Sequence, residues 1–278
     1  MTESKQGSET HGKEPHYVTG SLLNILSGET DNDGLVDGPN LWNVAHTERS
    51  RAILNHSLLV ARVANALGNA LKENLVKGFE DLDLRELTLA ALTHDAGKQF
   101  GVTREFLPDD KKNLRGIPSG FKEKSSEVDE AVVLWLSGIG MSALALQALK
   151  DHNFPSQVYE NSYWKIILVA DYMAGQEVTD VLTRVSDVGS RWVYDRIKQG
   201  KQPRISPERF EKAKGIILSV AGEIFGSLGL TDQQFIELHK LTSDKSQLKI
   251  ERFLRNTTDQ NREERVKHLV ELIVNNDG

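Results

Sequence analysis

The chain has 278 residues, of which 38% are hydrophobic and 27% charged, so it can bury a full core in one large domain or two smaller ones. Its 34 basic and 40 acidic residues give a formal net charge of −6, which excludes a chain-wide attraction to nucleic acid but leaves room for a local basic patch. The absence of cysteine excludes disulfides and thiolate metal sites, so histidine and carboxylate side chains are the only strong metal ligands.

Two features of the sequence bear on location. No apolar run approaches the roughly 20 residues that span a bilayer, and the opening stretch MTESKQGSETHGKEPH lacks the apolar core of a secretory signal. We therefore expect a cytoplasmic protein. Residues 1–15 are polar and lack large apolar side chains, which predicts a mobile N-terminal tail.

The first long helix is predicted from about residue 47 to residue 75. Apolar residues recur there at steps of three and four, which indicates one buried helix face. His56 falls on the same face. The apolar residues that define it are Ile53, Val60, Ala64, Leu67 and Leu71.

A second helix is predicted to begin at Asp83, with Glu86 as its capping-box partner. Its apolar stripe leads to His94, which is followed directly by Asp95, and Gly97 is well placed to end the helix. The stripe consists of Leu87, Ala90 and Ala91.

Residues 99–125 mix proline, glycine and charge without a period, which predicts a long loop. Later helices are predicted from Ser125 or Ser126 to Leu136, from Ser142 to His152, and from Asn161 or Ser162 through Asp171. Further helices are expected at about 187–199, from Ser206 to about 227, and as a charged pair over 231–275. Because no strand alternation and no internal repeat is evident, the predicted fold is all-α.

Ionisable residues occupy the apolar stripes of several predicted helices: His56, His94, His152 and Asp171. A lone histidine in such a place is more often a hydrogen-bonded core residue than a ligand. Asp171 is different, because an unpartnered buried carboxylate is costly and neither Lys nor Arg stands one helical turn away from it. One divalent metal ion bound by His56, His94, Asp95 and Asp171 would give all four buried side chains a partner.

The sequences around these residues, LNHSLLVARVA, LAALTHDAGK and IILVADYMA, resemble the ordered H…HD…D signature of the HD-domain superfamily of metal-dependent phosphohydrolases. The resemblance covers roughly residues 50–175. It implies an HD-domain helical bundle with additional C-terminal helices, and a divalent metal held by His56, His94, Asp95 and Asp171. On this basis we expect the metal-binding domain over 16–200, with helices of 201–278 packing on the bundle or at a dimer contact.

The resemblance also implies an activity, hydrolysis of a phosphoester of a nucleotide or other small metabolite, in which Asp95 orients the attacking water. The donor set suits Mn, Fe, Co, Ni, Zn or Mg. We expect one ion per chain, because residues 96–151 contain no histidine for a second site.

Four further residues are candidates for work at a phosphate. Lys98 can offer a point charge or be a solvated lysine at a helix end. His152 can contact phosphate or protonate the leaving group, ligate a second metal, or pack in the core. Arg51 can reach a phosphate from the start of its helix, and Arg115 belongs to a set of basic loop residues that can meet a polyanionic substrate.

The expected partner is therefore a small phosphoester or nucleotide. We expect no membrane partner and no general nucleic-acid binding, and the charged C-terminal helices suit a homodimer contact. Two other functional hypotheses stay open at this point: a di-iron oxygenase of the HD type, and an HD module that binds a ligand without turnover.

Overall fold

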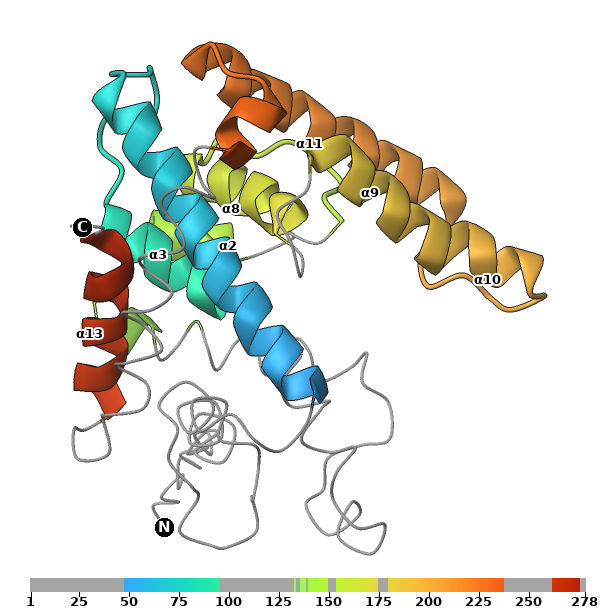
Figure 1. Ribbon diagram of the computed structural model, residues 1–278, viewed down its shortest axis with the longest axis horizontal. Coiled ribbons are helices and arrows are strands. Elements are labelled where there is room, and N and C mark those ends of the chain that lie inside the picture. The colour runs from blue at the N-terminus through green and yellow to red at the C-terminus, as the bar shows by residue number, and fades with distance from the viewer. Residues whose placement is uncertain are drawn as a thin grey trace, which may run out of the picture.

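The computed structural model describes residues 48–95, 133, 136–138, 140–149, 154–174, 180–237 and 262–275, with side chains from residue 56 in the first segment and from residue 267 in the last. All regular structure in these segments is helical, which confirms the all-α prediction (Figure 1). The predicted tail at 1–15 and loop at 99–125 lie outside the described residues. Within the described segments, no helix combines the length and hydropathy needed to cross a membrane.

The helices follow one another as α2 (Glu48–Glu73), α3 (Leu84–Thr93), α7 (Ala143–Ala148), α8 (Ser162–Met173), α9 (Val181–Gly189), the π-helical turn η1 (Ser190–Tyr194), α10 (Asp195–Lys198), α11 (Pro207–Leu228) and α13 (Arg262–Val274).

Helix α8 forms the centre of the bundle. It packs against α2, α3, α7, α9 and α11, and every residue in it is buried except Ser162 and Asp171. Asn161 caps the helix by accepting a hydrogen bond from the Trp164 amide at 3.1 Å. The run KIILVA is therefore a buried helix and not a strand, and Asp171 is the one carboxylate that α8 carries into this core.

Besides Asn161, three of the predicted helix caps are confirmed. Asp83 Oδ1 accepts from the amides of Arg85 and Glu86 at 2.7 and 3.2 Å. Ser142 and Ser206 likewise cap α7 and α11, and Pro207 opens the first turn of α11 as expected. Local sequence is sufficient at these positions because a cap needs only a short polar side chain next to the first free amides.

The predicted capping box at α3 is wrong in one respect. The Glu86 carboxylate does not return to the Asp83 amide but accepts hydrogen bonds from the amide and hydroxyl of Ser142, at 2.8 and 2.5 Å. The Asp83 amide donates to the hydroxyl of Tyr163 instead, at 3.0 Å. Tertiary partners on α7 and α8 thus replace the local one.

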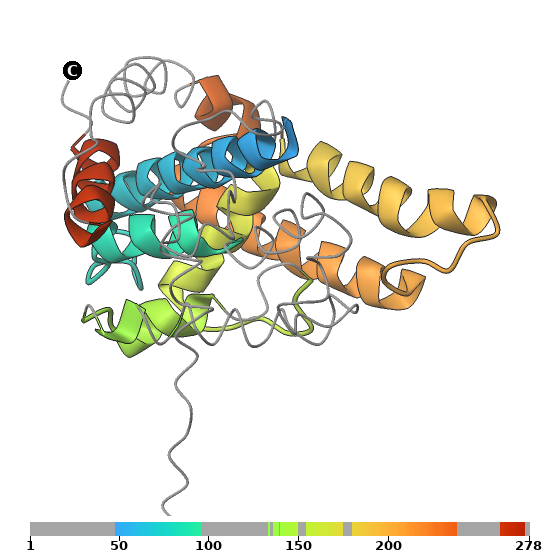
Figure 2. The same ribbon diagram turned by 90° about the horizontal axis from the view of Figure 1, so that it is seen from below.

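Helices α9, η1, α10 and α11 form an arm that projects from the bundle, and Figures 1 and 2 both show α10 at its outer end. The first of these helices begins at Val181, earlier than the predicted start near 187, because Asp180 caps it through the Thr183 amide. Gly189 lets α9 and α11 approach closely, since a Cβ at this position would overlap the ring of Phe210.

The C-terminal part of the chain returns to the bundle through α13, which packs on α2 and α3. Asn65 on α2 donates from Nδ2 to the Ile273 carbonyl at 3.2 Å, which satisfies one of the free carbonyls at the end of α13. Of the charged helical pair predicted over 231–275, residues 232–237 and 262–274 are helical, and 238–261 lie outside the described residues.

The packing of Gly189 gives a test of the arm. Gly189→Ala should lower the free energy of unfolding by about 1–3 kcal/mol, because the new methyl group must displace the buried Phe210 ring. Gly215→Ala is the matched control: it lies inside α11 with open space around its Cβ position, so it should raise stability by about 0.5–1 kcal/mol. Thermal and urea unfolding followed by circular dichroism measures both, and equal effects would contradict the packing.

Candidate metal centre

Three helices of the bundle each contribute polar side chains to one point. His56 lies on α2, on the predicted face whose neighbours Val60, Ala64 and Leu67 are buried. His94 and Asp95 follow the last turn of α3, and Asp171 lies near the end of α8. Because α2, α3 and α8 pack against one another, these residues from distant parts of the chain meet inside the bundle.

The ligand atoms lie at distances typical of neighbouring ligands of a single ion. His56 Nε2 is 3.0 Å from Asp171 Oδ1 and 3.6 Å from Asp95 Oδ2. His94 Nε2 is 3.6 Å from each of the same two oxygens. One atom from each of His56, His94 and Asp95 falls within 4.8 Å of the others. The four side chains thus form a compact cluster of two imidazoles and two carboxylates.

The orientation of His94 is fixed by its own helix. Its Nδ1 lies 2.6 Å from the carbonyl oxygen of Ala91, which can only accept a hydrogen bond, so Nδ1 carries the proton. In a neutral imidazole the other nitrogen, Nε2, then presents a lone pair to the two carboxylate oxygens. A lone pair facing two acceptors is repulsive, and a cation between them converts the repulsion into coordination.

The centre is nearly enclosed. The side chain of His94 is fully buried and that of Asp95 is 4% exposed, whereas His56 and Asp171 are 19% and 14% exposed. Burial raises the pKa of Asp171, but contacts with His56 and His94 outweigh it and hold that pKa well below its usual range. Asp171 is therefore an anion, and its more exposed side with His56 marks the open edge of the centre.

These residues fit a divalent metal ion. Imidazole nitrogens and carboxylate oxygens bind such ions at about 2.1 Å, which separates neighbouring ligands by about 3.0–3.4 Å. The contacts between histidine and aspartate here span 3.0–3.6 Å. The set could hold an ion with modest adjustment, and the donor types are those of borderline and hard divalent metals.

The other predicted site residues are not placed by the described part of the structure. Arg51 lies in α2, but its side chain is outside the described residues. Lys98, Arg115 and His152 lie in segments that are not described. Their roles stay predictions.

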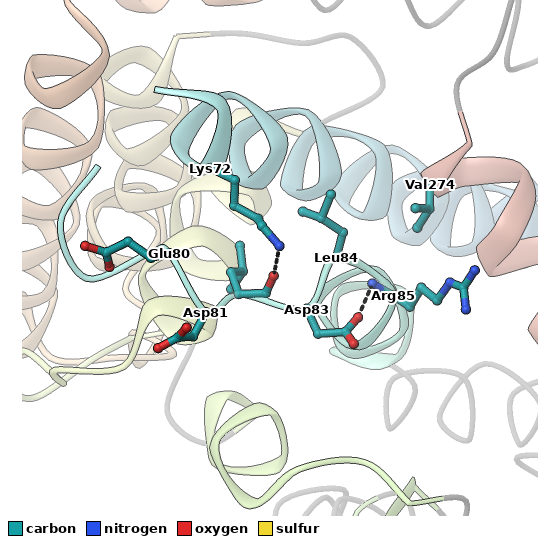
Figure 3. A pocket seen from close by; sticks show the side chains of 8 residues that line it. Lys72, Glu80, Asp81, Asp83, Leu84, Arg85 and Val274 are labelled. Atoms are coloured by element: carbon teal, nitrogen blue, oxygen red, sulfur yellow. Dashed lines mark hydrogen bonds between the residues drawn. The ribbon is translucent and has the colours of Figure 1, made fainter. Parts of the chain in front are cut away.

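A surface pocket lies elsewhere, around the start of α3. Figure 3 shows Lys72, whose Nζ donates to the Leu82 carbonyl, beside Asp83 and Arg85, with Val274 of α13 at its edge. Its lining carries charges of both signs and none of the four clustered side chains. The pocket therefore belongs to the junction of α2, α3 and α13 and not to the metal centre.

The network of Glu86 and Tyr163 was missed from the sequence, and it bears on the centre. Tyr163 donates to Glu86 Oε2 at 3.2 Å, joining α8 to α3. Glu86 precedes His94 by eight residues, and Tyr163 precedes Asp171 by eight residues. The two helices are thus tied together about two turns before the ligands that each carries, which sets their relative register.

The register gives a prediction. Tyr163→Phe removes the hydroxyl that ties α3 to α8, so it should weaken metal binding by roughly 3- to 10-fold and lower stability by about 1–2 kcal/mol. Isothermal titration of the metal-free protein with Co²⁺, at a temperature well below its melting temperature, measures the metal affinity.

Tyr194→Phe is the matched control for that titration, because it also removes a tyrosine–glutamate hydrogen bond, to Glu211 on the arm. It should leave the metal affinity unchanged. Equal affinities for the two variants would show that the network stabilises the fold without positioning the ligands.

Comparison with known proteins finds one family that matches the part of the chain containing this cluster. Residues 53–176 match the family model of the HD domain, a range that includes His56, His94, Asp95 and Asp171. No curated protein and no solved structure matches the chain significantly. The family match and the histidine–aspartate cluster agree, and together they show that this chain carries an HD domain, the domain of a superfamily of metal-dependent hydrolases.

Proposed function

We propose that the protein is a metal-dependent phosphohydrolase that acts on a nucleotide or another small phosphorylated metabolite. The observation that carries this proposal is the convergence of two imidazoles and two carboxylates, with contacts of 3.0–3.6 Å, at the open edge of a buried centre. A bound divalent ion would supply Lewis-acid stabilisation of phosphoryl charge and make water more acidic.

The chain's own residues divide the remaining work. His94 and His56 provide neutral nitrogen donors, and the Ala91 carbonyl holds His94 in the required tautomer. Asp171 provides a negative oxygen. Asp95, whose Oδ2 lies 3.6 Å from both histidines, can accept a hydrogen bond from the attacking water and orient it.

Four basic residues around the centre in sequence are assigned to the phosphate in this proposal. Lys98 stands three residues after Asp95 in the sequence, and we assign its flexible, positively charged side chain to a phosphoryl oxygen. We assign the same task to Arg51 and Arg115, and proton donation to the leaving oxygen to His152.

Asp171→Asn tests the core of the proposal. The substitution keeps the shape of the side chain but removes its charge, so metal content should fall from about one ion per chain to near zero, and turnover of phosphoesters should fall at least about 100-fold. Elemental analysis of the purified protein and a panel of nucleotides and phosphoesters with added Mn²⁺, Co²⁺, Ni²⁺, Zn²⁺ or Mg²⁺ measure both quantities.

His268→Gln is the control, because His268 lies half-exposed on α13, where it pairs with Glu271 at 3.7 Å. It should keep both metal and turnover. Wild-type protein that binds the ion and hydrolyses no phosphoester would overturn the activity while leaving the metal centre intact.

The assigned roles of Lys98 and His152 differ in their pH dependence. Lys98→Ala should weaken substrate binding and turnover at every pH, since it removes a charge that titrates far above neutrality. His152→Ala should reduce turnover by roughly 100-fold and remove one limb of the pH–rate profile. Metal content and pH–rate profiles of both variants test this: loss of metal in His152→Ala would make that residue a ligand, and unchanged kinetics would place it in the core.

A further inference from the structure

The outer end of the arm carries a charge opposite to that of the whole chain. Residues 190–214, here called the basic tip, contain eight lysine and arginine residues and three acidic ones. Their net charge is +5, whereas the formal net charge of the whole chain is −6. They comprise η1, α10, the connection to α11 and its first two turns, so they gather at the projecting end of the arm (Figures 1 and 2). Such a separation of charge indicates a surface for an anionic partner.

Within the described residues, five of the eight cations of the basic tip have no carboxylate within 4 Å. The other three are paired: Arg191 lies 2.6 Å from Asp187, Lys198 lies 3.9 Å from Asp195 and Lys214 lies 3.8 Å from Glu211, all between partly or fully exposed side chains, where such pairs are weak. Among the described residues, no carboxylate lies within 4 Å of the exposed side chains of Lys201, Arg209 and Lys212. Lys201 donates to the neutral amide oxygen of Gln199 at 2.9 Å, which leaves its charge uncompensated, so the positive charges of all three are available to a partner.

An apolar side chain is exposed beside these cations. Ile197, in α10, is 47% exposed. An isoleucine exposed among lysines and arginines contributes little to packing of the arm itself. The combination of basic and apolar side chains is typical of segments that rest on a lipid surface, where cations meet head groups and apolar side chains enter the interface.

The aromatic residues of the basic tip argue against single-stranded nucleic acid as the partner. Stacking of bases requires an open ring face. The Trp192 ring is covered by the Arg204 guanidinium at 5.2 Å and packs against Phe154. The Tyr194 ring meets the edge of Phe210, and its hydroxyl donates to Glu211 at 2.6 Å. The rings thus serve the internal packing of the arm.

We propose that the basic tip docks on an anionic membrane surface. Lys201, Arg209 and Lys212 contact lipid phosphates and carboxylates, and Ile197 enters the interface between them. The arm then holds the HD domain away from the bilayer. This revises our expectation of no membrane partner, which considered spanning segments and secretory signals, neither of which a peripheral contact needs.

Flotation of the full-length protein with vesicles tests the proposal. The protein should bind vesicles of phosphatidylcholine mixed with phosphatidylserine, should not bind phosphatidylcholine alone, and should be released by raised salt. Neutralising three cations of the basic tip should weaken binding on the order of 100-fold. The variant combines Lys201→Gln, Arg209→Gln and Lys212→Gln.

A matched control removes the same charge from other exposed positions of the bundle and α13, and should change binding by less than about twofold. It combines Lys77→Gln, Arg85→Gln and Lys267→Gln. Ile197→Asn, which keeps every charge, should weaken vesicle binding about 10-fold and shows whether the apolar contact contributes.

Three results would overturn the membrane contact: equal loss in the two triple variants, equal binding to neutral and anionic vesicles, or binding of the basic tip to an oligonucleotide but not to anionic vesicles. Because none of the substituted residues lies at the metal centre, these results are independent of the proposed hydrolase activity.

Discussion

The structure depends on the meeting of two carboxylates and two imidazoles inside a helical bundle. A buried carboxylate without compensation costs several kcal/mol, so the burial of Asp95 and Asp171 is tolerated only with partners that supply positive charge. His56 and His94 can supply it by taking up protons, or a cation can replace those protons. The Ala91 carbonyl holds a proton on His94 Nδ1 in both arrangements, so Nε2 faces the aspartates as a donor when it is protonated and as a ligand atom when a cation replaces that proton.

The geometry of this centre depends on the relative register of helices α3 and α8. The candidate ligands His94, Asp95 and Asp171 stand at the ends of α3 and α8, where small rotations of either helix would separate them. Glu86 and Tyr163 join these helices two turns earlier, and the almost complete burial of α8 prevents it from sliding. Polar contacts at one end and ligand contacts at the other thus hold the same pair of helices.

Much of this arrangement could be predicted from local sequence. The spacing of apolar residues and the capping side chains predicted the helices that begin after Asp83, Asn161 and Ser206. The polar residues on the apolar stripes indicated the candidate metal centre. The partner of Glu86 could not be predicted, because Ser142 and Tyr163 are 56 and 77 residues away and only tertiary packing brings them near. The basic tip is contiguous in the sequence, so its charge could have been predicted from residues 190–214; its place at the outer end of a projecting arm (Figure 1) depends on the packing of α9 and α11.

Electrostatics connects the centre to the chemistry proposed for it. The two aspartates present negative charge to the centre, and the contacts of Asp171 with His56 and His94 hold its pKa well below its usual range, so it stays ionised at neutral pH. A phosphate is itself an anion and would be repelled by such a site. Recognition of phosphate therefore requires either a cation among these ligands or basic side chains at the open edge near His56 and Asp171. The sequence supplies Lys98 just beyond the aspartate of the HD pair, so both conditions can be met within one short stretch of chain.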